Sequence, residues 1–194
     1  VVLAAVAMIA SAELFSLVVA CGGHPYGVAG IAASGALVLL ATAEPTPAGA
    51  GAYIIAVLVA LVLITLTASV WLRWSEGEPQ AAVAATLLGS VYVGGTLSFA
   101  VFLRNLPATL VPPYEAVSWP AIGFVLLPLV SVWVGDSAAF FVGHAWGRRK
   151  LFPKVSPGKT VAGGVAGLIG STVAGAVVAV LTLSSLPGAG VSLS

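Results

Sequence analysis

The sequence is poor in charge. Only 7% of its 194 residues are Asp, Glu, Lys or Arg, whereas ordinary soluble domains carry about 25%. Hydrophobic residues make up 60% of the chain. So few charges cannot cover the surface of a soluble domain of this length. We therefore expect lipid to surround most of the chain.

Metal-ligating side chains are also scarce. Cys21 is the single cysteine, which excludes a disulfide within the chain and a cysteine-based metal site. We expect it to be a small buried thiol. The two histidines, His24 and His144, have no second histidine, cysteine or acid at ligand spacing. Structural or interfacial roles are therefore favoured for both over metal ligation.

Long hydrophobic runs dominate what is present. A membrane-spanning helix needs about 20 apolar residues, and segments rich in Gly, Pro and Glu separate the runs. We predict an all-α fold, a polytopic integral membrane helical bundle, in which residues 1–194 form a single transmembrane domain. Its roughly six spans lie near residues 1–20, 27–42, 51–72, 81–103, 119–146 and 157–186.

The last of these runs has a face of small residues at helical spacing. Such a face lets the backbone of a second helix approach closely. We therefore predict tight helix packing along a stripe that consists of Gly163, Gly167, Gly170 or Ser171, and Ala174.

Positive charge is concentrated in one loop. Five of the seven Lys and Arg residues fall between Arg148 and Lys159, and no acid follows Asp136. Because Lys and Arg favour the cytoplasmic side, we expect this basic loop, about residues 147–158, to be cytoplasmic. Alternating helices then place the loop around Arg73 on the same side and residue 1 on the opposite side.

The basic loop runs into Ser-Pro-Gly-Lys-Thr at residues 156–160. Its Gly-Lys-Thr is similar to the end of a P-loop, but that motif needs a glycine where this chain has Pro153. Proline has neither a free N–H nor a free φ angle, so the P-loop interpretation fails. Ser-Pro is typical of a helix start, and we predict Ser156 as the N-cap and Pro157 as the first helical residue.

Such a helix start predicts an anion site. The first backbone N–H groups of a helix have no partner within it, and the helix dipole is positive there. Phosphate is the favoured ligand, and the alternative is an anchor that touches lipid headgroups. The contributing residues would be Gly158, Lys159 and Thr160.

Two acids lie within hydrophobic runs. A carboxylate at membrane depth is costly and usually faces the protein interior or a water-filled cavity. Asp136 shares a helical stripe with residues 140, 143 and 147, which leads to the basic loop. We expect Asp136 to hold Mg²⁺, which prefers carboxylate and phosphate oxygens; the alternative is a buried acid that is paired or protonated. Glu13 fits a functional role and a place near the headgroups equally well.

The segment 133–167 resembles the central block of bacterial phosphatidate cytidylyltransferases, also called CDP-diacylglycerol synthases. It reads WVGDSAAFFVGHAWGRRKLFPKVSPGKTVAGGVAG. The positions shared with the family pattern are Asp136, Ser137, Ala139, Phe141, Gly143, Gly147, Arg148, Lys150, Leu151, Pro153, Lys154, Ser156, Pro157, Lys159, Thr160 and Gly163. The segment departs from the pattern at Ala138, Phe140, His144, Val161 and Ala162.

The resemblance implies an enzyme that makes CDP-diacylglycerol and pyrophosphate from CTP and phosphatidic acid. Such a transfer depends mainly on positioning and charge neutralisation, with Mg²⁺ as the cofactor. The implied catalytic residues are Lys159 and Asp136, the latter also at the metal. The implied phosphate-binding residues are Ser156, Gly158, Lys159, Thr160, Lys154 and Arg148.

The resemblance also implies a bacterial inner membrane protein whose active site faces the cytoplasm. Its partners would be CTP, phosphatidic acid and membrane lipid, with no nucleic acid; a homodimer is left open. The family's C-terminal signature, Ser-x-x-Lys-Arg followed by Lys-Asp, His-Gly-Gly and Asp-Arg-x-Asp, does not occur in this sequence. We therefore expect a fragment that is inactive alone.

Three other functions stay open. A transporter or channel could use Asp136 as an ion relay and the basic loop as a gate. A CDP-archaeol synthase or a polyprenol kinase would use a nucleotide and a different lipid.

Overall fold

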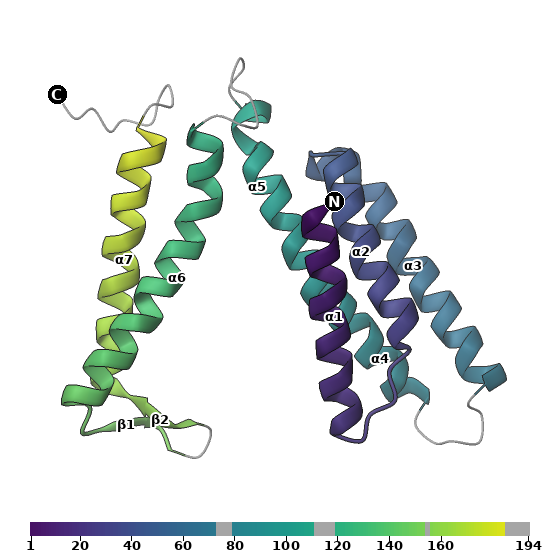
Figure 1. Cartoon of the computed structure of the whole chain (residues 1–194), viewed down its shortest axis with the longest axis horizontal. Coiled ribbons are helices and arrows are strands. Elements are labelled where there is room, and N and C mark those ends of the chain that lie inside the picture. The colour runs from purple at the N-terminus through teal and green to yellow at the C-terminus, as the bar shows by residue number, and fades with distance from the viewer. Residues whose placement is uncertain (73–78, 111–118, 154–155, 185–194) are drawn as a thin grey trace. The chain divides into compact units, whose positions relative to one another are not determined.

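The chain is almost entirely helical (Figure 1). The computed structural model describes residues 1–72, 79–110, 119–153 and 156–184. In these ranges five helices are long and apolar enough to cross a membrane, and Gly27–Ala43 is a shorter apolar helix. The predicted all-α membrane fold is therefore confirmed.

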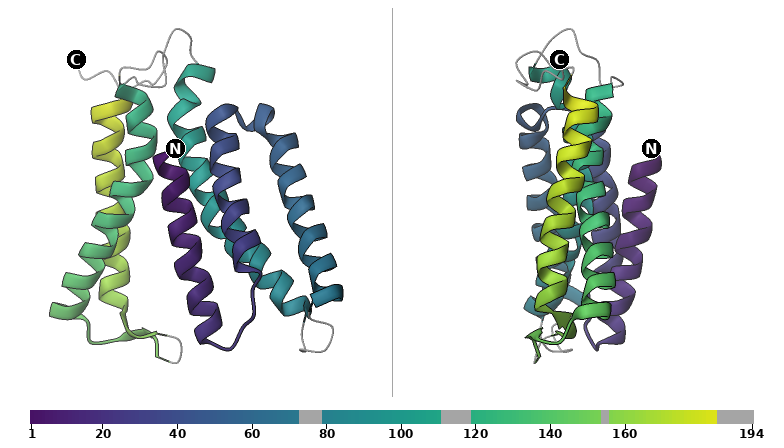
Figure 2. Two further views of the ribbon diagram at one scale, coloured as in Figure 1. Left: turned by 45° about the vertical axis from the view of Figure 1, so that its right-hand side comes forward. Right: turned by 90° about the vertical axis from the view of Figure 1, so that its left-hand side faces the viewer.

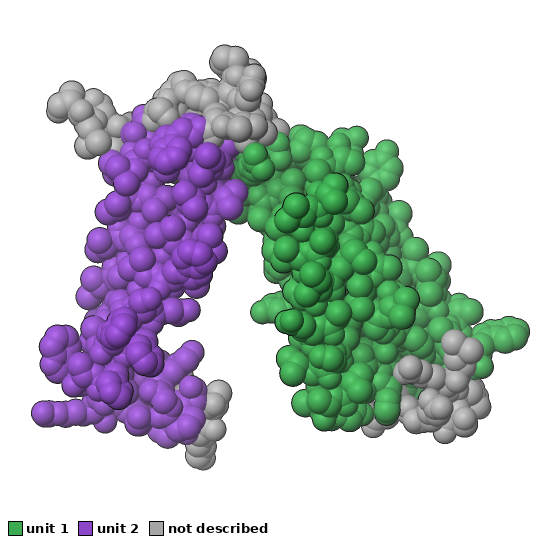
Figure 3. All heavy atoms as spheres, viewed as in Figure 1, with its two compact units in different colours: residues 1–105 green, residues 106–194 purple. Residues whose placement is uncertain are grey.

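Two compact units make up the chain, Val1–Asn105 and Leu106–Ser194, shown in green and purple in Figure 3. Each unit has its own packing. The expectation that residues 1–194 form a single domain stays a prediction.

Unit 1 contains the first four predicted spans. The fourth is a continuous helix interrupted by one π-helical turn, η1, which the hydrophobic pattern does not indicate. The elements are α1 (Val2–Ala20), α2 (Gly27–Ala43), α3 (Pro47–Leu72), α4 (Pro79–Ser90), η1 (Val91–Gly95) and α5 (Thr96–Leu110).

Helix α2 is the centre of unit 1 and packs against α1, α3, α4 and η1 (Figures 1 and 2). Small side chains on its buried face allow the neighbouring backbones to come close. The approach is closest at η1, where a β-carbon built on Gly94 would lie 2.6 Å from the Cα of Ser34. Any side chain at position 94 would therefore push η1 away from α2.

Buried hydroxyl groups link the helices of unit 1. The Ser34 hydroxyl donates to the carbonyl of Gly30 at 3.0 Å, and the Ser90 hydroxyl donates to the same carbonyl at 3.1 Å. The backbone N–H of Tyr26 donates to the hydroxyl oxygen of Thr86 at 2.7 Å. Hydrogen bonds between helices supply specificity in a membrane, where burial of apolar surface from water does not hold helices together.

Cys21 follows the last residue of α1 and is exposed. The expectation of a buried thiol is therefore wrong. Its place at the helix end, beside the turn to α2, leaves it outside the packed faces of both helices.

Unit 2 is an antiparallel pair of helices, α6 (Trp119–Trp146) and α7 (Val161–Leu183), joined by a short β-hairpin. The views of Figure 2 agree that the two helices run side by side. The indole N–H of Trp119 donates to the carbonyl of Leu181 at 2.8 Å, which joins the beginning of α6 to the end of α7.

The predicted small-residue stripe of α7 lies in this interface. A β-carbon on Gly167 would lie 3.2 Å from the β-carbon of Ala139, and one on Gly163 would lie 2.7 Å from the Ala139 carbonyl oxygen. On α6, Gly135 is buried against Gly167 and Ser171. The prediction of tight packing along this stripe is confirmed.

Candidate functional site: a basic hairpin between two membrane helices

The basic loop forms a β-hairpin at the ends of α6 and α7 (Figure 1). Strand β1 (Lys150–Phe152) pairs antiparallel with β2 (Ser156–Thr160). Lys150 lies opposite Thr160, and Phe152 lies opposite Ser156. The backbone N–H of Val161 donates to the carbonyl of Arg149 at 2.9 Å, so the first residue of α7 is joined to the residue before β1.

This arrangement corrects the predicted helix start. Ser156 is not the N-cap and Pro157 is not the first helical residue, since both belong to β2. The N-cap is Thr160, whose hydroxyl oxygen accepts a 3.2 Å hydrogen bond from the backbone N–H of Gly163. The physical reason is that Ser156 and Thr160 can both act as an N-cap. Pairing with β1 keeps residues 156–160 extended, so the helix begins after Thr160.

The correction changes the expected anion site. Gly158, Lys159 and Thr160 lie in a strand, so their N–H groups are not the unpaired first amides of a helix. Lys159 and Gly158 are exposed, and a β-carbon built on Gly158 would have nothing within 4 Å. An anion can therefore reach the backbone at Gly158 and the ammonium group of Lys159.

Thr160 differs from its two neighbours because its side chain is buried, with 5% of its surface exposed. It lies between the end of α6 and the first turn of α7, against Gly143, Gly147 and Gly163. Its hydroxyl oxygen is already an acceptor for Gly163.

The hairpin presents several exposed cations. Arg148, Arg149 and Lys150 are exposed along with Lys159, and Asp136 is the one acid of unit 2 within the described ranges. Lys154, which was expected to bind phosphate, lies outside the described residues. The net charge of the described residues of unit 2 is therefore positive, which favours an anionic ligand.

Asp136 lies on α6 and is exposed in unit 2. The preceding residue, Gly135, is buried against α7. The residues of the predicted stripe have different surroundings. Gly143 and Gly147 contact Thr160, while Asp136 and Phe140 are exposed. Asp136 is thus not a buried acid of this helix pair.

The donor set limits how a metal could bind. In the part of the chain that the structure describes, no three His, Cys, Asp or Glu side chains gather into a metal site. Mg²⁺ is commonly held by one or two carboxylates together with substrate phosphates and water. A single carboxylate such as Asp136 matches this pattern only where a bound ligand and water supply the other oxygens.

Comparison with known proteins identifies the family. The profile described as "Cytidylyltransferase family" matches residues 1–193. The chain belongs to the cytidylyltransferase family. No solved structure matches.

Curated relatives of this cytidylyltransferase chain are named phosphatidate cytidylyltransferase. The protein of Bacillus subtilis is 32% identical over 82 residues, which cover 42% of this chain and 26% of the relative. That of Haemophilus influenzae is 53% identical over 45 residues, covering 23% and 16%. That of Pseudomonas aeruginosa is 49% identical over 51 residues, covering 26% and 19%. The matches thus span about a quarter or less of these relatives' lengths, and the family resemblance seen in the sequence is confirmed.

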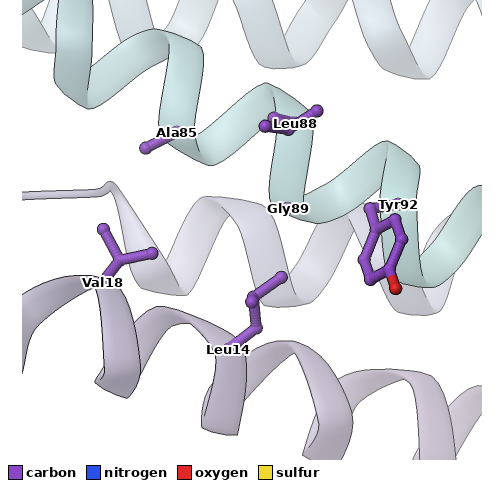
Figure 4. A pocket seen from close by; sticks show the side chains of 6 residues that line it. All are labelled: Leu14, Val18, Ala85, Leu88, Gly89 and Tyr92. Atoms are coloured by element: carbon purple, nitrogen blue, oxygen red, sulfur yellow. The ribbon is translucent and has the colours of Figure 1, made fainter. Parts of the chain in front are cut away.

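An apolar pocket in unit 1 of this cytidylyltransferase-family chain was not predicted. It lies between α1 and the α4–η1 segment (Figure 4) and has a volume of about 240 Å³. No lining residue is charged, so the pocket does not suit a phosphate group. Hydrophobic periodicity gave no signal for it. The lining residues are Leu14, Val18, Ala85, Leu88, Gly89 and Tyr92.

Proposed function

We propose that the protein is a CTP:phosphatidate cytidylyltransferase, which makes CDP-diacylglycerol and pyrophosphate in phospholipid synthesis. The observation that carries the proposal is the basic hairpin at the ends of two membrane-spanning helices, in a chain of the cytidylyltransferase family. A triphosphate from the aqueous phase and a lipid phosphate from the membrane can meet only near the headgroup layer. The hairpin joins the ends of two apolar helices long enough to span a membrane, which supports a place at such a boundary.

In the proposed reaction, an oxygen of the phosphatidic acid phosphate attacks the α-phosphorus of CTP. The bond between that phosphorus and the oxygen bridging to the β-phosphate breaks, and pyrophosphate leaves with the electron pair. Negative charge grows on the leaving group. Exposed cations that are already in place, Lys159 above all, stabilise this charge.

The other predicted site residues differ in how exposed they are to a ligand. Arg148 is exposed at the base of the hairpin and can reach a phosphate, while Ser156 is half-buried in β2. Mg²⁺, when bound, would neutralise phosphate oxygens. Asp136 would hold it from α6, and Lys154 stays a prediction.

We further propose that the hairpin faces the cytoplasm of a bacterial inner membrane, where CTP is available. Its cluster of Lys and Arg supports this orientation. Membrane lipid would surround the spans, and no nucleic acid takes part. A homodimer stays a prediction.

The test is an assay of the purified full-length protein with labelled CTP, phosphatidic acid and Mg²⁺. The expected result is labelled CDP-diacylglycerol and an equal amount of pyrophosphate. Omission of phosphatidic acid, replacement of CTP by ATP and addition of EDTA are the controls. No lipid product from intact, folded protein would contradict the proposal.

Lipid competition in the same assay separates the rival functions. Product from an unsaturated archaeal ether lipid phosphate, but not from phosphatidic acid, would indicate a CDP-archaeol synthase. Phosphorylated polyprenol would indicate a kinase. Ion flux in proteoliposomes without nucleotide would indicate a transporter or channel.

A further inference from the structure

The side chain of Thr160 fits into a socket made of three glycines. A β-carbon built on Gly147 would lie 2.5 Å from Oγ1 and 2.6 Å from Cγ2 of Thr160. Similar β-carbons on Gly143 and Gly163 would lie 3.0 and 3.1 Å from the same Oγ1. The socket therefore exists only because these three positions have no side chain.

The socket joins three elements at one residue. Gly143 belongs to the last turn of α6 and Gly147 directly follows that helix, while Gly163 belongs to the first turn of α7 and Thr160 ends β2. The 3.2 Å hydrogen bond from the Gly163 N–H to Thr160 Oγ1 is buried. Thr160 thus fixes where the hairpin leaves the helix pair.

Lys159 is the residue next to this anchor and is exposed. The pairing of β2 with β1 is irregular in this stretch, and residues 157–159 are all exposed while Thr160 is buried. The Lys159 side chain therefore lies where solvent and a soluble anion can reach it, directly beside the buried anchor. The backbone of Lys159 sets where its flexible side chain begins. On one side, the neighbouring residue Thr160 holds this backbone in place.

We propose that Thr160 is a positioning residue that holds Lys159 toward the phosphates of CTP and does not itself contact them. The buried hydroxyl serves as the N-cap of α7, and it acts on nucleotide binding through Lys159 alone. The inference rests on the proposed function for the identity of the anion, and on the glycine socket for the position of Lys159.

The first test is a double-mutant cycle in the full-length protein, with the Kd for CTP measured by isothermal titration. Thr160→Val keeps the shape of the side chain and removes the cap, and we expect it to weaken binding about tenfold. Lys159→Ala should weaken binding more, and Thr160→Val/Lys159→Ala no further than Lys159→Ala alone. Independent effects that multiply would show that Thr160 contacts phosphate directly and would overturn the proposal.

Thr160→Ser is the conservative variant. It keeps the hydroxyl acceptor for Gly163 and loses only a methyl group, so the Kd for CTP should stay within about threefold of the wild type. A Ser variant as weak as the Val variant would contradict an action through the cap. Because Thr160→Ser keeps the hydroxyl that accepts from Gly163, it remains available for measurement if Thr160→Val does not fold.

The second test needs no nucleotide. Trypsin cuts after Lys159, and the rate of this cut reports how firmly β2 is held. We expect Thr160→Val to raise the rate at least about fivefold relative to the cut after Arg148 in the same molecule. Gly164→Ala, on α7 with only one atom near its β-carbon, at 3.9 Å, is the matched control and should leave the ratio unchanged.

The two tests fail in distinguishable ways. If the wild type binds no CTP, the proposed function fails, whereas the trypsin ratio still reports on the socket. If Thr160→Val leaves that ratio unchanged in folded protein, the positioning role is wrong, whatever the nucleotide.

Discussion

The hydroxyl of Ser11 on α1 donates a 2.7 Å hydrogen bond to the hydroxyl of Ser34 on α2, and both side chains are fully buried. Ser34 in turn donates to the carbonyl of Gly30. This short chain joins the first two spans through polar groups in an otherwise apolar environment.

Ser34→Ala should lower the free energy of unfolding by about 1–3 kcal/mol, because the buried Ser11 hydroxyl loses its acceptor. Ser11→Ala should cost less, since Ser34 keeps its bond to Gly30. The double variant should cost less than the sum of the two. Unfolding in detergent measures all three, and strict additivity would show that the pair is not coupled.

Neighbouring glycines of α7 should respond differently to alanine. A methyl group at Gly163 meets the Ala139 carbonyl at 2.7 Å, while one at Gly164 meets only Leu151 at 3.9 Å. We expect Gly163→Ala to destabilise by about 1–3 kcal/mol. Gly164→Ala should be neutral or stabilising by up to about 1 kcal/mol. Thermal unfolding of both variants checks this, and equal melting temperatures would contradict the described helix interface.

Lys159→Ala should lower kcat/KM for CTP by about 100-fold, because a charge-assisted contact to phosphate is lost. Arg149→Ala removes another exposed cation, from the residue before β1. It serves as the matched control, and its effect should be several-fold smaller. Similar losses in both variants would mean that the hairpin acts through its total charge and that Lys159 has no specific role.

Asp136→Asn should raise the Mg²⁺ concentration for half-maximal activity about tenfold or more, because an amide replaces the proposed metal ligand. Glu13 is the other acid within a span and is exposed on α1. Glu13→Gln neutralises it and serves as the comparison. A magnesium titration of both variants separates the two acids. An unchanged titration for Asp136→Asn would remove this residue from the metal site.

Cys21 offers a test of orientation. It is exposed at the end of α1, and alternation of the spans puts it on the same side as the basic hairpin. A membrane-impermeant maleimide should therefore label Cys21 in inside-out vesicles and not in intact cells. Cys21→Ser is the control for specificity, and labelling only from outside would reverse the proposed topology.

The spans could be predicted from the sequence because length and hydropathy decide them. Runs of about 20 apolar residues separated by turn residues admit few other folds in lipid. Gly163 and Gly167 were placed in a helix interface correctly, since their spacing marks one face of α7. These signals are local and do not depend on what the helices contact.

The hairpin could not be predicted in the same way. Ser156 and Thr160 are both good N-cap residues, and only pairing with Lys150–Phe152 decides between them. That pairing depends on a turn and on packing against α6. The glycine pattern at 143 and 147, read beside the Gly-rich start of α7, was the one available sign that Thr160 is enclosed.

The π-helical turn η1 changes how the fourth span must be understood. A turn of this kind holds an extra residue in the helix, and each residue of an α-helix advances by about 100° around its axis. The side chains after Gly95, including those of the buried Ser98 and Phe102, therefore follow the helical periodicity of α4 only after a shift of one residue in the sequence. Deletion of one residue within 91–95 would turn η1 into a regular α-helical turn, and the second half of the span would keep its present neighbours. η1 is thus the place in this span where a residue can be lost without rotating one half of the helix against the other.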